Sequence, residues 1–182
     1  MKRHPKQITR TRRRAARLAA LFLLFLTLFL TACTGNAAPA PSSSVPASSI
    51  RVEVTVDCSL VLENPKTRQT AKDIVALLIE RGHSDEKGIF FEGQLQLLPG
   101  KTAFDALLST GLQVSYTSSS FGPFIHAING LGDGDAGATS GWVYLVNGQA
   151  PTVSSGLYVL EDGDLIRWRY SVEESDLMEA GS

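Results

Sequence analysis

Residues 121–170 constrain the fold more than any other part of this 182-residue chain. They contain both tryptophans and three short apolar runs, at residues 124–128, 142–146 and 165–170. In the last run, apolar and other residues alternate, which places Ile166, Trp168 and Tyr170 on one face and Leu165, Arg167 and Arg169 on the other. A period of two indicates a half-buried strand. The dipeptides Asn147-Gly148 and Asp162-Gly163 are typical of tight turns, so this stretch predicts a β-rich unit.

Upstream, strand and helix patterns are interleaved. Residues 50–56 alternate cleanly and predict a strand, which residues 58–62 either continue or leave at a bend. Residues 71–81 have apolar residues at helical spacing, and Gly82 suits the end of that helix. A short apolar run follows at residues 89–91, and further strands are predicted at residues 94–98 and 112–116.

A second helix is predicted just after residue 101. Thr102 and Asp105 have the spacing of a capping pair, in which each side chain accepts a hydrogen bond from the other residue's backbone N–H. Gly111 is placed to end the helix in a left-handed conformation. The residues expected to form its buried stripe are Phe104, Leu107 and Leu108.

These elements predict one α+β domain of ordinary size. We expect a mixed sheet to pack across the central helix that begins after Thr102, because this arrangement buries the apolar face of the sheet and that of the helix against each other. The helix at residues 71–81 is then an extra helix inserted after the first strands. The residues expected in the core of the β-rich stretch are Ile125, Val143, Leu145, Ile166 and Trp168; alternation alone leaves open that the two faces are exchanged.

The first 32 residues predict an export signal. They carry eight Lys or Arg residues and no acid, followed by the apolar run 18–30, which is too short for a spanning helix. Leu-Thr-Ala-Cys at residues 30–33 matches a bacterial lipobox, so Cys33 is expected to be acylated and to become the mature N-terminus. The alternative is an ordinary secretory signal with a chance cysteine. Arg12-Arg13 only weakly suggests the twin-arginine route, because Arg14 and two alanines follow.

Residues 33–49 are expected to be a flexible tether, because Ala, Pro and Ser dominate them. The domain would then lie at residues 50–172, with an acidic tail at residues 173–182, on the extracytoplasmic face of a bacterial membrane. Without the signal, 9 basic residues face 18 acidic ones, a formal charge of −9. This charge disfavours nucleic acid as a partner. The expected membrane contact is lipid, through acylated Cys33.

Motifs for catalysis and for metal binding are absent or incomplete. His83 and His126 are the histidines left after the signal, and the chain has no H-E-x-x-H, G-x-S-x-G or C-x-x-C. We therefore predict that the protein is not an enzyme and has neither a cofactor nor a metal centre. Residues 132–137 read G-x-G-x-x-G, but a strand rather than a helix should follow. An EF-hand from Asp133 would need glutamate where Tyr144 stands; a loose calcium site and a mobile surface loop are the alternatives.

Three motifs in the β-rich stretch carry a family resemblance. They are FGPFI-x-x-I-N-G, S-G-W-x-Y-x-V-N-G and Y-x-L-x-D-G-D-x-I-x-W-x-Y, supported upstream by residues 54–59 and 98–108. Together they resemble the transcobalamin-like C-terminal domain, a bacterial family labelled DUF4430. The resemblance covers residues 50–172 and implies a β-grasp-like fold. It also implies a second cysteine near Ala136; with none there and Cys33 acylated, Cys58 is expected to be a buried or free thiol.

The resemblance also implies a ligand and its contacts. Corrinoid contacts in such domains come from the strand that begins in the first motif and from the tryptophan-containing hairpin. Carried over by position, the expected ligand-binding residues are Phe124, Ala127, Ile128, Asn129, Trp142, Tyr144 and Asn147. The large helical barrel that completes such a site in eukaryotic cobalamin carriers is missing from this sequence, so a second ligand-binding protein or a transporter is an expected partner.

Two functions remain open from the sequence. The first is a lipid-anchored module that captures a small ligand of the corrinoid type for uptake, because Tyr and Trp give large, rigid apolar contact with a polar tip. The second is a cell-surface protein-interaction or adhesion module with no small-molecule ligand. The aromatic residues could also simply complete a small hydrophobic core.

Overall fold

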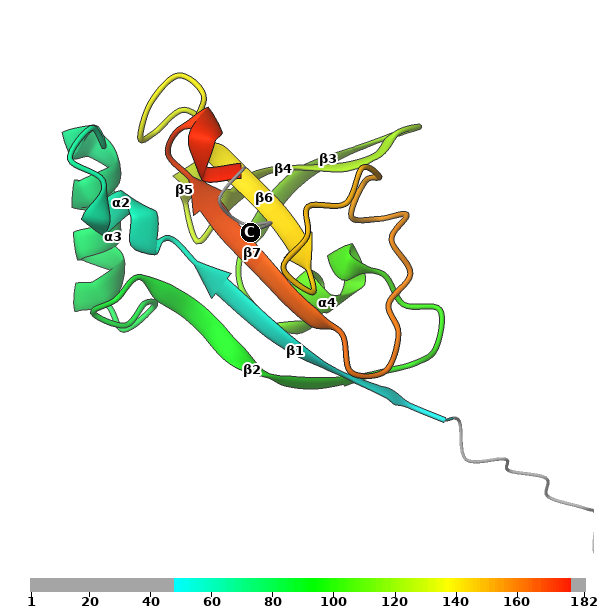
Figure 1. The fold of residues 1–182 in the computed structure, drawn as a ribbon. Coiled ribbons are helices and arrows are strands. Elements are labelled where there is room, and N and C mark those ends of the chain that lie inside the picture. Colours follow the sequence, from blue (N-terminus) through cyan, green and yellow to red (C-terminus); the bar gives the residue numbers. More distant parts are fainter. Residues whose placement is uncertain (1–47, 178–182) are drawn as a thin grey trace, which may run out of the picture. The chain divides into compact units, whose positions relative to one another are not determined.

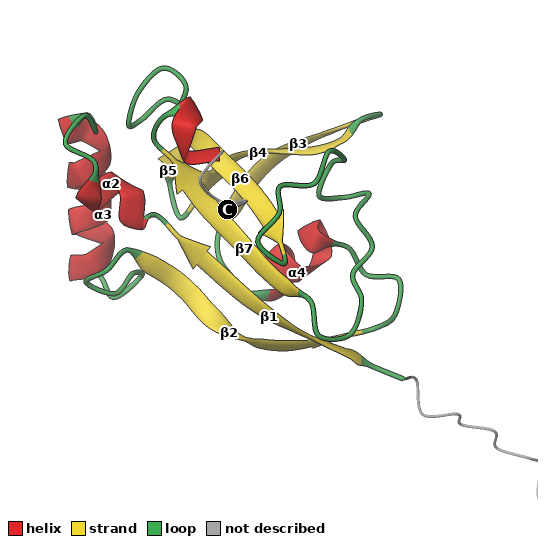
Figure 2. Cartoon of the chain, viewed as in Figure 1, coloured by secondary structure: helices red, strands yellow, loops and turns green. Residues whose placement is uncertain are grey.

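The computed structural model describes residues 48–177, apart from the side chains of Ser175 and Leu177. These residues form an α+β fold with two sheets (Figures 1 and 2). The predicted signal segment, Cys33 and most of the predicted tether lie outside the described residues. Within residues 48–177, no helix combines the length and apolar character needed to cross a membrane.

The larger sheet is mixed and has the strand order β2-β1-β7-β6. Strand β1 (Ile50–Asp57) pairs antiparallel with β2 (Ile89–Leu97) and parallel with β7 (Leu165–Ser171), which pairs antiparallel with β6 (Gly141–Val146). The separate sequence signals at residues 89–91 and 94–98 thus belong to one strand. The predicted strands at residues 50–56, 142–146 and 165–170 are confirmed.

The smaller sheet has the order β3-β4-β5, with β3 at Val114–Ser119, β4 at Gly122–Ile128 and β5 at Leu131–Gly132. The predicted strand at residues 124–128 is confirmed within β4, and the one at residues 112–116 begins two residues later than expected. The division into two sheets was not predicted. It arises because β4 pairs locally with β3 and β5, whereas β6 and β7 join the sheet built on β1.

Two helices, α2 (Ser59–Glu63) and α3 (Gln69–Glu80), lie together at one end of the larger sheet (Figure 1). Helix α2 settles the open question at residues 58–62, because the chain bends into a helix after β1 instead of extending the strand. Helix α3 confirms the helix predicted at residues 71–81 and buries Ala71, Val75 and Leu78. The described chain ends in a 3₁₀ helix, η1 (Glu174–Leu177).

Helix α4 (Ala103–Ser109) begins at the predicted capping pair. The Thr102 hydroxyl accepts from the Asp105 N–H at 3.2 Å, and the Asp105 carboxylate accepts from the Thr102 N–H at 2.9 Å. Gly111 has φ 77°, as expected for the residue that ends the helix. The predicted stripe is wrong for Leu108, which is 42% exposed, whereas Phe104 is half-buried and packs against the core. The fully buried residues of α4 are Ala103, Ala106 and Leu107.

The core lies on one face of β6 and β7, and the strand register determines which face. Trp142 pairs with Tyr170, Tyr144 with Trp168 and Val146 with Ile166, so these six side chains share a face. Ile125, Ile166 and Trp168 are buried, as predicted. Val143 and Leu145 were also expected on the core face, and this prediction is wrong. Val143 is half-buried, and Leu145, although buried, pairs with Arg167 on the face of the sheet that points away from the core.

Candidate functional site

A cleft of about 360 Å³ opens beside the first half of β4, and we name it the aromatic cleft. Its wall comes from the core face of β6 and β7, and its rim comes from the β3–β4 turn and from the loop around residue 154. The residues that line it are Ser119, Phe121, Gly122, Pro123, Phe124, Ile125, Trp142, Tyr144, Ser154, Ser155 and Trp168.

The wall is a set of aromatic rings held by one another. Tyr144 stacks on Trp168 with 5.5 Å between ring centroids, and Trp142 meets Tyr170 edge to face at 5.3 Å. The polar tips of Trp142 and Tyr144 are already engaged: the Trp142 Nε1–H donates to the Leu131 carbonyl at 2.8 Å. The Tyr144 hydroxyl donates to the Val153 carbonyl at 2.6 Å. The wall therefore offers rigid apolar ring surface to the cleft.

Burial also affects the ionisation of Tyr144. It raises the pKa of this phenol to about 12, with a smaller contribution from the neighbouring Tyr158. The Tyr144 hydroxyl therefore stays protonated at neutral pH and keeps donating to Val153. This bond links the wall of the cleft to the loop that forms part of its rim.

The rim exposes large apolar side chains. Phe121 is 84% exposed and Phe124 is 58% exposed, and both line the cleft. Val153 and Leu157, in the loop near Ser154, are also exposed. Exposed apolar side chains at the rim of a concave surface, as Phe121 and Phe124 are here, are typical of a binding site.

Two glycines allow the rim segments to approach closely. A Cβ at Gly122 would lie 2.1 Å from the Ser154 Oγ, and a Cβ at Gly156 would lie 2.5 Å from the Pro123 Cδ. Gly122 also has φ 109°, which L side chains rarely adopt. The sequence Phe-Gly-Pro at residues 121–123 thus brings the β3–β4 turn against the loop and shapes one end of the cleft.

Two polar atoms of the lining lack protein partners. The Trp168 Nε1–H and the Ser154 Oγ are buried, and neither forms a hydrogen bond with any residue that the structure describes. Trp168 as a whole is almost fully buried. A buried polar group without a partner costs about 1–3 kcal/mol, so such groups call for an explanation. A ligand with a hydrogen-bond acceptor is one.

His126 lies on β4, next to the rim. Its Nε2 is 2.9 Å from the Thr117 hydroxyl, its Nδ1 is 3.8 Å from a carboxylate oxygen of Asp133, and its ring meets Phe124 edge to face. The order hydroxyl, imidazole, carboxylate is that of a nucleophile triad. However, 3.8 Å is too long for the hydrogen bond that would orient the imidazole, and both His126 and Thr117 are accessible to solvent. The geometry therefore favours a role for His126 as support for Phe124.

The loop that follows β5 is built from its own polar groups. The Asp135 carboxylate accepts from the Gly132 N–H at 2.7 Å, and the Gly134 N–H donates to the Ser140 carbonyl at 3.0 Å. The loop leads into strand β6, as expected from the sequence, and not into a helix. Burial raises the pKa of Asp133, although His126 opposes this shift. Within the described part of the chain, no three His, Cys, Asp or Glu residues are grouped as metal ligands.

The structure brings together three of the seven predicted ligand-binding residues: Phe124, Trp142 and Tyr144 line the aromatic cleft. Ile128 is fully buried in the core, and Ala127 is half-buried between Ile128 and His126 in β4.

The two predicted asparagines occupy turns away from the cleft. Asn129 has φ 50°, accepts from the Gln113 N–H, and lines a separate groove of about 510 Å³ with Arg81 and His83. Asn147 has φ 52°, and its side chain donates to Asp164 and accepts from the Leu165 N–H. Asn147 thus stabilises the connection between β6 and β7.

Eight of the eleven residues that line the cleft were not among the expected ligand-binding residues: Ser119, Phe121, Gly122, Pro123, Ile125, Ser154, Ser155 and Trp168. Trp168 was expected only in the core, which is correct for its burial. The Phe-Gly-Pro sequence was a usable signal for Phe121 and Pro123, because an aromatic residue in a turn has little core to enter. Ser154 and Ser155 lie in a loop with no periodic pattern.

Comparisons with known proteins give one family match. Residues 100–172 match the family described as "Domain of unknown function (DUF4430)". No curated protein matches the chain. Among solved structures, haptocorrin in complex with Cbi is 18% identical with a TM-score of 0.46; the match covers 69% of this chain and 25% of that chain. A putative metal binding protein from Ruminococcus gnavus ATCC 29149 is 15% identical with a TM-score of 0.38, covering 67% of this chain and 96% of that chain.

Proposed function

We propose that this chain, which carries a DUF4430 domain at residues 100–172, binds the apolar face of a ring-shaped ligand in the aromatic cleft. The exposed phenylalanines of the rim carry this proposal. Covering Phe121 and Phe124 would contribute about 1.5–3 kcal/mol each, because both side chains are now largely in water. The stacked wall behind them is already ordered, so little further entropy is lost on binding.

The two buried polar atoms of the cleft that lack a hydrogen-bond partner indicate which polar groups the ligand should carry. The Trp168 Nε1–H needs an acceptor, and the Ser154 hydroxyl can donate or accept. Protein covers both atoms, so a ligand reaches them only if the loop around residue 154 moves aside; an apolar ring with peripheral amide or carbonyl groups would then satisfy both requirements. A corrinoid has this chemistry, and it is the ligand implied by the resemblance of the three motifs to the transcobalamin-like domain, so it is the first to test.

The cleft is shallow and open at the rim, so we expect it to cover only one side of a corrinoid. A second ligand-binding protein or a transporter would cover the other side. We further propose that the β-grasp-like domain is held at the extracytoplasmic face of a membrane by acylated Cys33, and that it captures its ligand without catalysing a reaction. The lipobox-like residues 30–33 and the basic segment before them support the anchor.

Fluorescence can test ligand capture directly, since both tryptophans of the chain line the cleft. Residues 48–177 contain both sheets and the whole described core, so a protein of residues 44–182, which includes them, is the one to titrate. Cobinamide and cobalamin should quench or shift its emission saturably at micromolar concentration. Tryptophan amide measured in parallel corrects for absorption by the corrinoid.

Phe124→Ala is the informative variant, because Phe124 is exposed and its truncation should leave the fold intact. Trp142→Ala is less suitable, since it removes a buried hydrogen bond. We expect Phe124→Ala to weaken binding about tenfold or more, from the lost apolar contact. Leu98→Ala is the matched control: Leu98 is 55% exposed but does not line the cleft. Equal affinity in Phe124→Ala and Leu98→Ala, or no saturable change with wild type, would exclude capture in this cleft.

One observation favours the second candidate, a protein-interaction module. Val153 and Leu157 are exposed although neither lines the cleft, so a small ligand in the cleft would leave both uncovered. If the rim serves a protein alone, Phe124→Ala and Leu157→Ala will both reduce partner capture on cells, while corrinoids leave the tryptophan emission unchanged.

A further inference from the structure

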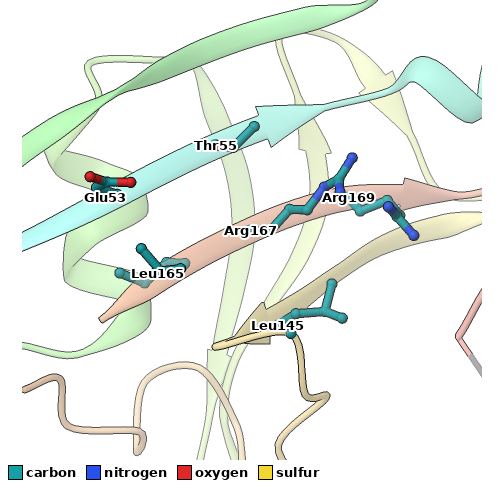
Figure 3. Close-up of a pocket in the computed structure, with 8 residues that line it drawn as sticks. Glu53, Thr55, Leu145, Leu165, Arg167 and Arg169 are labelled. Carbon is teal, nitrogen blue, oxygen red and sulfur yellow. The ribbon is translucent and has the colours of Figure 1, made fainter. Parts of the chain in front are cut away.

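A second groove, of about 260 Å³, lies on the face of the larger sheet that points away from the core (Figure 3). We name it the arginine groove. It is lined by Glu53 and Thr55 of β1, Leu145 of β6, and Leu165, Arg167 and Arg169 of β7. Its distinctive feature is two guanidinium groups in an otherwise acidic domain, where 18 acidic residues outnumber the 9 basic ones after residue 32.

The two arginines differ in their partners. The Arg167 Nε–H donates to Asp57 at 2.6 Å, and the Asp57 side chain is fully buried. Arg167 therefore neutralises a carboxylate that belongs to the fold. Arg169 stands opposite Asp57 in the β1–β7 register, yet among residues 48–177 no carboxylate pairs with it. Its Nε is buried and has no acceptor among them either.

An unpaired guanidinium at a groove is suited to a carboxylate. The planar group presents two parallel N–H donors to the two oxygens of a carboxylate, which a lysine cannot do. A carboxylate that turned the Arg169 head toward the groove would also give its Nε–H an acceptor. Thr55 pairs with Arg167 in the β1–β7 register and adds a hydroxyl group to the same groove.

The other residues that line the groove indicate what kind of group the ligand carries beyond its carboxylate. Leu145 and Leu165 provide apolar lining, and Leu165 is 51% exposed. Glu53 pairs with Leu165 and lies four residues before Asp57, so it is about 13 Å along the strand from the level of Arg169. A negative charge at this end repels a second acidic group on the ligand.

We propose that the arginine groove binds a small monocarboxylate with an aliphatic body. The Arg169 head turns along β7 toward the groove and contacts the carboxylate. The aliphatic chain then runs over Leu145 toward Leu165, and Glu53, at the level of Leu165, selects against dicarboxylates. This site is on the opposite face of the sheet from the aromatic cleft and does not depend on corrinoid binding.

The probe is hexanoate, added to ¹⁵N-labelled protein of residues 44–182 while the arginine Nε–Hε signals are followed by NMR. We expect a saturable downfield shift of the Arg169 signal at millimolar hexanoate. Hexanol, which has the same chain without the charge, should leave that signal in place. Phosphate, which has charge without an apolar body, should bind at least about tenfold more weakly than hexanoate, because it lacks contact with the two leucines.

Two variants complete the test. Arg169→Lys keeps the charge but loses the paired donors, and we expect about tenfold weaker binding of hexanoate, followed through the amide signals of β7. Arg81→Lys, outside the groove, is its control and should bind as wild type does. Adipate should bind the wild type weakly and bind Glu53→Gln about as well as hexanoate does.

Three results would overturn the proposal: no saturable shift of Arg169 with hexanoate, equal shifts with phosphate and hexanoate, or Arg169→Lys binding as wild type does. The first two are measured on the wild-type protein, so they stand even if a variant does not fold. Unchanged near-ultraviolet circular dichroism shows that each variant keeps the aromatic core.

Discussion

Replacing Gly122 with alanine should destabilise the protein for two separable reasons. The first is the backbone, because φ 109° is unfavourable for a residue with a Cβ. The second is space, because the new Cβ would lie 2.1 Å from the Ser154 Oγ and 2.7 Å from the Ser154 Cβ. Both distances are shorter than any contact the atoms can sustain, so the loop or the β3–β4 turn must shift.

The chain contains a control for the first effect. Gly130 has φ 85°, and a Cβ there would meet no atom within 4 Å. Gly130→Ala should therefore lose only the conformational part, about 1–2 kcal/mol of the free energy of unfolding. Gly122→Ala should lose this amount and, in addition, about 1–3 kcal/mol from overpacking against Ser154.

Ser154→Gly removes both atoms that collide with the new Cβ, so the double variant Gly122→Ala/Ser154→Gly should recover the overpacking part. Urea unfolding followed by tryptophan fluorescence gives the four free energies of this cycle, and we expect a coupling of about 1–3 kcal/mol. Gly122→Ala no less stable than Gly130→Ala, or a cycle without coupling, would refute the close approach of turn and loop that shapes the cleft.

The remaining predictions concern other groups. The pKa of Tyr144 is raised from 10.0 to about 12 by burial, so its stabilising contribution is complete below about pH 10 and is lost as the pH rises through about 12. Tyr144→Phe should therefore show a shallower loss of stability over this range in urea unfolding at stepped pH; curves of equal slope would contradict this. Burial, and secondarily Asp57, raises the pKa of the Cys58 thiol, so a thiol reagent at pH 8 should label Cys58 only after urea unfolding. Labelling of the folded protein at the unfolded rate would contradict the buried position. Thr102→Ala should lower the free energy of unfolding by about 0.5–2 kcal/mol through loss of the α4 cap, while Thr117→Ala, an exposed strand control, should lose less.

Local patterns predicted most individual elements. Alternation identified β1 and β7 because a strand buries every second side chain, and Thr102 with Asp105 located the start of α4 because a cap is made within four residues. Which face of α4 is buried could not be predicted from the local sequence, because it depends on how the helix packs against the sheets. Ala103 and Ala106 are fully buried there, whereas Leu108, which was predicted on the buried face, is exposed.

The same distinction holds for the aromatic cleft. Aromatic residues were recognised in the sequence, and position in a motif selected Phe124, Trp142 and Tyr144 correctly as neighbours. Asn147 was selected on the same basis, although its positive φ and its bonds to Asp164 and Leu165 give it a structural role in a turn. Ser154 could not be found, because its place in the cleft depends on contact between the loop and Gly122, a pairing that no sequence pattern records.

Strand β7 connects the two proposed sites through its period of two. Trp168 faces the aromatic cleft, and the residues on either side of it, Arg167 and Arg169, face the arginine groove. A shift of one residue in the β1–β7 register would bury the guanidinium groups and expose the indole. The ion pair between Arg167 and the fully buried Asp57 opposes such a shift, because the shift would leave that carboxylate without its cation. Arg167 therefore stabilises the register on which both proposed sites depend. Arg169 forms no such ion pair with a residue that the structure describes, so its guanidinium group is available to the proposed ligand.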